Sequence, residues 1–282
     1  MKTAPLFSVL MANYNNGRFI QEAINSVLSQ TYSNWEIIIV DDKSTDNSYE
    51  VYEKYKNDER FHIFYNEKNM GCGYTKHQCV LHSNGVYCGY LDPDDVLLPK
   101  ALEVSVRNLE GHSDSVLSFS RLYYCDEKLN ILRESRLLIM EEGETYLEHG
   151  DYVPECFASF LREAYLKTEG INPYLRAGVD QDLYFRLEEY GSISVVNEFT
   201  YKYRQRKGSV SHDGDYALLW NIKVRFDAFE RRNIVIAKDS VLFKAFNKRL
   251  EEEADSVRLT RSYRLGRLLL KPFLRIKKQK AI

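Results

Sequence analysis

The chain of 282 residues is 44% hydrophobic and 28% charged, a composition typical of a globular protein with one sizeable α/β domain and a smaller appendage, or with two small domains. Its formal net charge of -2 gives no support to a nucleic-acid partner. The apolar runs around 37–40 and 268–270 are too short to cross a bilayer, and the first five residues lack the apolar core of a signal peptide, so we expect a cytoplasmic protein.

The first hundred residues alternate between two hydrophobic periods. Apolar runs predict buried strands at 7–11, 35–40, 61–65 and 86–91. Apolar residues at helical spacing predict helices between these strands, over 19–28, around 51–55 and over 74–81. The resulting βαβαβαβ order predicts a parallel sheet wrapped by helices.

The later part of the chain has a looser pattern. It predicts strands at 116–124, 131–139 and 193–203, a loop with a short element at 154–162, and helices at 182–189 and from 216 onward. We therefore expect an α/β domain, 1–215, and a helical C-terminal extension, 216–282.

Acidic side chains follow the fourth predicted strand at its carboxyl end, where doubly wound sheets bind ligands. The strand runs directly into Asp92-Pro93-Asp94-Asp95, which puts three carboxylates within four positions. Clustered carboxylates repel one another unless a cation neutralises them, and Mg²⁺ or Mn²⁺ commonly bridges such groups to a diphosphate. The sequence therefore favours a divalent metal site here, with an exposed turn of helix-capping acids as the alternative.

The ends of the first two strands carry groups that suit a nucleotide. Neither a Gly-x-Gly-x-x-Gly motif after the first strand nor a P-loop motif occurs in the sequence, which argues against a dinucleotide dehydrogenase and a P-loop enzyme. Asp41, at the end of the second strand, can accept a hydrogen bond from a nucleobase N–H. Tyr14, after the first strand, can pack on the face of a base.

Several segments, in their order and spacing, resemble glycosyltransferase family 2. They are the opening strand and turn Ser8–Asn15, the helix Ile20–Tyr32, the strand and loop Ile37–Asp46, the motif Leu91–Asp95 and the helix Val179–Leu187. The resemblance covers roughly residues 6–212. It implies an α/β, glycosyltransferase-A-like fold, with a mostly parallel sheet flanked by helices and a helical C-terminal extension.

The resemblance also implies roles for individual residues. Asp180 would be the catalytic base, although helix N-capping is an alternative that needs only a short acid at this position. Asp94 would ligate the metal through the donor diphosphate, and His212, in a basic segment after the last strand, would also reach the metal, with an ordinary surface residue as the alternative for His212. The residues implied in donor binding are Tyr14, Asn15, Asp41, Lys76 and Asp92, with Lys76 standing where family members often carry Arg.

The implied reaction is a single displacement that inverts the anomeric carbon. Asp180 takes the proton from an acceptor hydroxyl as that oxygen attacks the donor sugar, with Mn²⁺ or Mg²⁺ as cofactor. The expected partners are a nucleotide-sugar donor and a lipid-linked saccharide acceptor, in bacterial surface-polysaccharide assembly. A nucleotidyltransferase and an inactive sugar-nucleotide-binding protein are the alternatives.

The segment 258–280 mixes apolar residues with many Lys and Arg and has no Asp or Glu. A basic amphipathic helix of this kind can lie on an anionic membrane surface. We expect the chain to bind the inner face of the membrane through this tail, with a helix packed on the catalytic domain as the alternative.

Overall fold

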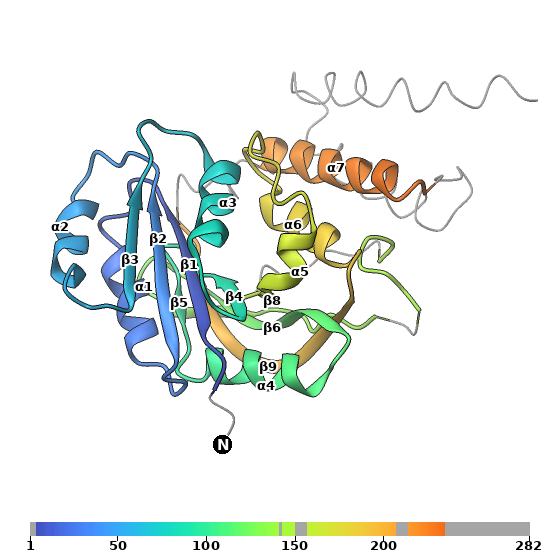
Figure 1. Cartoon of the computed structure of the whole chain (residues 1–282), viewed down its shortest axis with the longest axis horizontal. Coiled ribbons are helices and arrows are strands. Elements are labelled where there is room, and N and C mark those ends of the chain that lie inside the picture. The colour runs from blue at the N-terminus through green and yellow to red at the C-terminus, as the bar shows by residue number, and fades with distance from the viewer. Residues whose placement is uncertain (1–3, 141–142, 150–156, 207–213, 235–282) are drawn as a thin grey trace, which may run out of the picture.

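The computed structural model describes residues 4–140, 143–149, 157–206 and 214–234 (Figure 1). Its first half contains four parallel strands, β1 (Phe7–Asn13), β2 (Trp35–Asp41), β3 (Phe61–Tyr65) and β4 (Tyr87–Tyr90), in the order β3-β2-β1-β4. They are connected by α1 (Ile20–Leu28), α2 (Ser48–Tyr52) with the 3-10 turn η1 (Glu53–Tyr55), and α3 (Cys72–His82). The predicted βαβαβαβ order is confirmed.

Further strands extend this sheet beyond β4 and make it mixed. The short β8 (Ser159–Leu161) pairs antiparallel with β4 and with β6 (Ser115–Cys125), and β6 pairs parallel with β9 (Ser192–Arg204). Two more strands, β5 (Val96–Leu97) and β7 (Ile131–Glu134), pair antiparallel with β9 and β6. The strand predicted at 131–139 ends at Glu134, because the exposed β7 gives way to a segment that turns Leu138 into the core.

The two faces of the sheet are covered by separate layers of helices (Figure 1). Successive side chains of a strand point to opposite faces. Phe7, Val9 and Met11 therefore pack with α1, α2 and α4 (Ala101–Gly111), whereas Leu10 packs on the other face. That second face is covered by α3, α5 (Arg162–Lys167), α6 (Val179–Leu187) and α7 (Gly214–Arg231). The predicted sheet flanked by helices is confirmed.

The helix predicted from residue 216 onward is confirmed over α7, which forms part of the main core. Its Val224, Ala228 and Phe229 are buried in the same cluster as the apolar side chains of α6.

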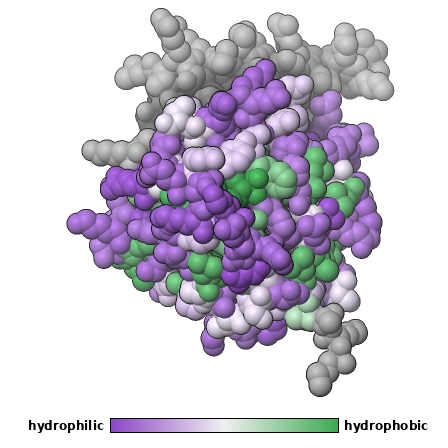
Figure 2. Space-filling view, turned by 60° about the vertical axis from the view of Figure 1, so that its left-hand side comes forward, coloured by the Kyte–Doolittle hydropathy of each residue, from purple (hydrophilic) through white to green (hydrophobic). Residues whose placement is uncertain are grey.

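The basic segment 258–280 lies outside the described residues, so membrane binding there stays a prediction. Across the described ranges, no helix has both the length and the apolar character that a membrane span requires. The face in Figure 2 is largely hydrophilic, with smaller hydrophobic patches.

Candidate active site

The parallel strands β1, β2 and β4 end at one edge of the sheet, and backbone hydrogen bonds bring the segments after them together. Asp42 N donates to Asn13 O at 2.8 Å, and Leu91 N donates to Leu10 O at 2.9 Å. These contacts carry the turn Asp92–Asp95 to the end of β1. Ligands of such sheets bind at this edge.

Asp41, expected to read a nucleobase, is only 3% exposed and holds the loop after β2. Its Oδ1 accepts a hydrogen bond from Ser44 N at 2.7 Å. Its Oδ2 accepts from the Tyr52 hydroxyl at 2.8 Å and from Asn13 Nδ2 at 3.1 Å. Burial, reinforced by the Asp41 charge, raises the pKa of Tyr52 well above its ordinary value, so this hydroxyl stays a donor. A nucleobase would therefore meet a carboxylate that three protein groups already contact.

Tyr14 and Asn15 lie on the turn after β1. Asn15 has a φ of 57°, a left-handed conformation that Asn adopts more readily than most residues. Its Oδ1 accepts from Thr45 N at 2.8 Å, and its own N donates to Ser44 Oγ at 3.0 Å. Asn15 thus ties the turn to the loop after β2, whereas Tyr14 is 48% exposed and free to pack against a flat ligand.

Asp42 supports the site in a way that sequence analysis missed. Its carboxylate accepts from Asn66 Nδ2 at 2.8 Å, from Met70 N at 2.7 Å and from Gly71 N at 2.8 Å. Gly71 has a φ of 91°, and a Cβ there would lie 2.2 Å from the Arg176 guanidinium, so the position requires glycine. Asp42 thereby fixes the start of α3. The Asp-Asp pair at a strand end was a signal that could have found it.

The three carboxylates of the turn after β4 have different surroundings. Asp95 is 2% exposed, and its oxygens accept from the Tyr201 hydroxyl at 2.7 Å and from Arg204 N at 2.6 Å, both in β9. Burial, and then the charges of Asp94 and Asp92, raises the pKa of Asp95 well above its ordinary value. Asp95 therefore anchors the turn to β9 and is not available to a ligand.

Asp94, the expected metal ligand, is paired with a cation from the segment after β9. Arg206 Nε donates to Asp94 Oδ2 at 2.5 Å, and Arg206 Nη2 donates to Asn16 Oδ1 at 2.9 Å. The Arg206 and Asp94 side chains are 24% and 16% exposed. Arg204, which is buried, donates from Nε to Asp94 O and from Nη2 to Glu22 Oε2, both at 2.5 Å. Two arginines thus hold this turn.

Lys76 of α3 brings the expected base and the remaining carboxylate of the turn together. Its Nζ lies 2.7 Å from Asp180 Oδ1 and 3.3 Å from Asp92 Oδ1. Burial disfavours the ammonium charge, but the charges of Asp180 and Asp92 outweigh this effect and raise the pKa of Lys76 well above its ordinary value. Lys76 is therefore a permanent cation between two acidic residues.

Asp92 is subject to opposing influences. Burial raises its pKa most, the Lys76 ammonium opposes the increase, and the charges of Asp180 and Asp94 add to it. Because 43% of the Asp92 side chain is exposed, we expect water to moderate this increase. Asp92, Asp94 and Asp180 thus form one acidic group, in which Lys76 pairs with Asp92 and Asp180, and Arg206 pairs with Asp94.

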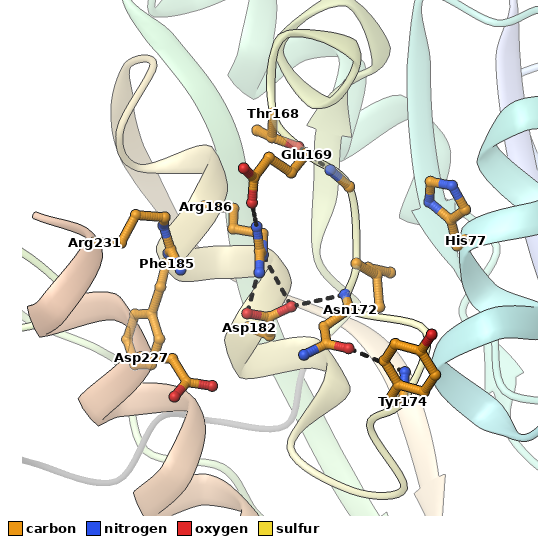
Figure 3. A network of polar contacts seen from close by, with 12 residues as sticks. His77, Thr168, Glu169, Asn172, Tyr174, Asp182, Phe185, Arg186, Asp227 and Arg231 are labelled. Atoms are coloured by element: carbon orange, nitrogen blue, oxygen red, sulfur yellow. Dashed lines mark hydrogen bonds and ion pairs between the residues drawn. The ribbon is translucent and has the colours of Figure 1, made fainter.

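The helix that carries Asp180 is fixed by a buried ion pair (Figure 3). Arg186 Nε donates to both oxygens of Asp182 at 3.0 Å, and Asn172 N donates to Asp182 Oδ2 at 3.1 Å. The N-cap residue is Gly178, with a φ of 68°, and within the described residues no side chain caps α6. The capping alternative for Asp180 is therefore wrong, because its carboxylate contacts α3 instead.

The acidic group offers an incomplete set of metal ligands. In the part of the chain that the structure describes, no group of three or more His, Cys, Asp or Glu side chains could hold a metal ion. Asp92 and Asp94 supply carboxylate oxygens, and Mg²⁺ typically takes one or two carboxylates together with substrate phosphates. This donor set fits a metal that binds together with a diphosphate. His212, the other expected ligand, lies outside the described residues.

Comparisons with known proteins agree on the family. The family model for glycosyl transferase family 2 matches residues 8–169. An uncharacterized glycosyltransferase of Methanocaldococcus jannaschii is 32% identical over 209 residues, which cover 71% of each chain. The putative colanic acid biosynthesis glycosyl transferase WcaA of Escherichia coli K12 is 36% identical over 211 residues, which cover 71% of this chain and 72% of WcaA.

A solved structure shows the same fold. The crystal structure of S. aureus TarS 1-349 in complex with UDP-GlcNAc has a TM-score of 0.73 at 17% identity, covering 92% of this chain and 79% of that chain. The glycosyltransferase-A-like fold expected from the sequence is therefore confirmed. The chain belongs to glycosyltransferase family 2 and is a glycosyltransferase.

Proposed function

We propose that the enzyme transfers a sugar from a nucleotide-diphosphate donor to an acceptor hydroxyl, with a divalent metal and with inversion at the anomeric carbon. The observation that carries this proposal is the approach of Asp180 of α6 to Asp92 of the turn after β4, on either side of one ammonium group. Asp180, as the base, would contact the acceptor, and Asp92 would contact the donor. Their closeness suits a reaction in which the acceptor hydroxyl attacks the donor sugar.

The names of similar proteins support the proposed substrates. WcaA is named for colanic acid biosynthesis, and TarS has been crystallised with UDP-GlcNAc and with UDP. We therefore take UDP-GlcNAc as the first donor to test, and a lipid-linked saccharide of bacterial surface-polysaccharide assembly as the acceptor class. Such an acceptor would bring the enzyme to the inner face of the membrane.

The proposed chemistry assigns a task to each group. Asp180 Oδ1 is bound by Lys76, which leaves Oδ2 to accept the proton of the acceptor hydroxyl. The acceptor oxygen forms its bond to the anomeric carbon as the bond to the nucleoside diphosphate breaks on the opposite side, which inverts the configuration. Asp92 and Asp94 would hold the metal, and a metal bound there would offset the negative charge of the departing diphosphate. Tyr14 would pack on the base.

A donor panel with an Asp94→Asn variant tests this proposal. UDP-GlcNAc, UDP-glucose, UDP-galactose and GDP-mannose are incubated with Mn²⁺ or with a chelator, and the released nucleotide is identified. We expect one donor to yield a nucleoside diphosphate only with Mn²⁺, and Asp94→Asn to lose this activity. Pyrophosphate release from a nucleoside triphosphate and a sugar phosphate would indicate a nucleotidyltransferase. Metal-dependent UDP binding without turnover of any donor would indicate an inactive binding protein.

A further inference from the structure

We infer that Lys76 positions the general base, because its ammonium holds one oxygen of Asp180 and presents the other oxygen to the acceptor. The inference rests on the proposed function and refines it. It gives Lys76 a role different from the donor binding that its place in the sequence suggested.

Lys76 is itself held in place from several sides. It is 5% exposed, and its Nζ lies 4.9 Å from the centre of the Tyr90 ring, within the range of a cation–π contact. The Tyr90 hydroxyl donates to Lys76 O at 2.7 Å. One turn earlier in α3, Gly73 N donates to Leu175 O at 3.3 Å. These contacts hold the Lys76 ammonium in one position.

Asp180, in contrast, has freedom only in its side chain. The Asp182–Arg186 pair and the contact with Asn172 fix the backbone of α6 (Figure 3). The Asp180 side chain is 49% exposed, and its Oδ1 accepts a hydrogen bond from Lys76 Nζ at 2.7 Å. Without Lys76 the carboxylate would rotate in solvent, so the ammonium selects the orientation of the base.

The charges around Lys76 argue against a second task as a ligand of the diphosphate. Of the three N–H groups of an ammonium, two are engaged by Asp180 and Asp92, and the Tyr90 ring covers a further side. An anionic diphosphate would have to displace a carboxylate to reach it. Lys76 is therefore placed to hold the Asp180 carboxylate in one orientation, and Asp92 helps to hold the Lys76 ammonium.

The test compares Lys76→Gln and Lys76→Arg with a matched control, Lys167→Gln. Lys167 also pairs with an acidic side chain, Glu163 at 2.7 Å, but its side chain is 55% exposed and belongs to α5. The measurements are the kcat, KM and pH–rate profile for the most active donor of the panel, and the affinity for UDP with Mn²⁺ by calorimetry.

We expect Lys76→Gln to lower kcat about 100-fold while UDP affinity changes less than about threefold, because positioning affects the reaction more than binding. The acid limb of the pH–rate profile should move to higher pH, because a carboxylate that loses an adjacent cation is protonated more easily. Lys76→Arg keeps the charge and should recover most of the turnover and the original profile. Lys167→Gln should behave as the unmodified enzyme.

An unchanged kcat and pH profile in Lys76→Gln, with UDP affinity reduced more than about tenfold, would overturn the inference and make Lys76 a donor ligand. If Lys76→Gln does not fold, Lys76→Met, which keeps an unbranched side chain of similar length without the charge, takes its place, and the same shift of the acid limb is required. Asp180→Asn is measured in parallel. Normal turnover of Asp180→Asn would refute the proposed base, whereas an inactive Asp180→Asn beside a normal Lys76→Gln would refute only the positioning role.

Discussion

Arg206 Nε donates a hydrogen bond to Asp94 Oδ2 at 2.5 Å, so the carboxylate that we assign to the metal is already paired with a protein cation. A second bond, from Arg206 Nη2 to Asn16 Oδ1, holds the guanidinium at the end of β1. A metal that binds Asp94 through the same oxygen has to compete with Arg206. Arg206 and a metal ion would therefore compete for Asp94 Oδ2.

We predict that Arg206→Gln lowers the Mn²⁺ concentration needed for half-maximal UDP binding, because the competing cation is removed. The pair is partly exposed, so the expected change is about two- to fivefold. Calorimetric titration of UDP at a series of Mn²⁺ concentrations measures it. Arg60→Gln is the control. Arg60 pairs with Asp58 at 2.7 Å just before β3, at the opposite edge of the parallel strands from the turn after β4. A higher Mn²⁺ requirement in Arg206→Gln would show instead that Arg206 helps to bind the diphosphate.

Asp180→Asn should abolish most turnover and leave folding intact. The amide has the size of the carboxylate but cannot accept the proton, and loss of a general base typically costs 10²- to 10⁴-fold, so we expect a decrease on the order of 10³-fold. The melting temperature and UDP affinity should stay close to those of the unmodified enzyme, because Asp180 does not cap α6. Initial rates and thermal melts of the same preparations check this. Retained activity with a much earlier melt would contradict the assignment.

Asp182→Asn, two residues away, should have the opposite effect. Asp182 is 2% exposed and neutralises Arg186, whose own side chain is 10% exposed. Removing one partner of a buried ion pair costs about 3–5 kcal/mol, and the exposed Glu169, whose Oε2 lies 3.4 Å from Arg186 Nη1, offsets only part of the lost charge. Urea unfolding should therefore show a large loss of stability, with turnover reduced only in proportion to the unfolded fraction. A loss below about 1 kcal/mol would mean that the pair is solvated.

The reactivity of Cys72 offers a probe of the site at the start of α3. Although Cys72 as a residue is exposed, burial of its thiol raises the pKa to about 11, and the charge of Lys76 only partly opposes this increase. Because the thiolate is the reactive form, iodoacetamide labelling should be slow at neutral pH and rise about tenfold per pH unit up to roughly pH 10. The experiment uses the Cys156→Ser variant to remove labelling at the fifth cysteine. The other three, Cys79, Cys88 and Cys125, are buried. A labelling rate that levels off near pH 8.5 would show an ordinary thiol, and protection by UDP with Mn²⁺ would link Cys72 to the donor site.

Local patterns in the sequence predict much of this fold. The apolar runs of β1 to β3 and the helical spacing in α1 and α3 depend on residues close together in the chain, and all of these elements are present. The acidic turn after β4 and the helix carrying Asp180 also lie where the motifs indicate. These features are set by short-range periodicity and by the order of segments.

The partners of the acidic residues could not be predicted in this way. Lys76 and Asp180 are 104 positions apart, and Arg206 and Asp94 are 112 positions apart. Asp95 was one of three similar carboxylates in the sequence, and only the approach of Tyr201 from β9 shows that it is an anchor. Such pairings depend on how β9 and α6 pack against the N-terminal half of the fold. No local sequence pattern encodes this packing.

The most direct test of the single displacement is the configuration of the sugar that the enzyme first releases from UDP-GlcNAc, or from the most active donor of the panel, when water is the acceptor. Proton NMR at high enzyme concentration distinguishes the two anomers before they equilibrate. We predict that an α-linked donor yields the β-anomer first, and that Asp180→Asn releases it far more slowly. Initial release of the α-anomer would contradict the account, because it would require a mechanism with retention of configuration.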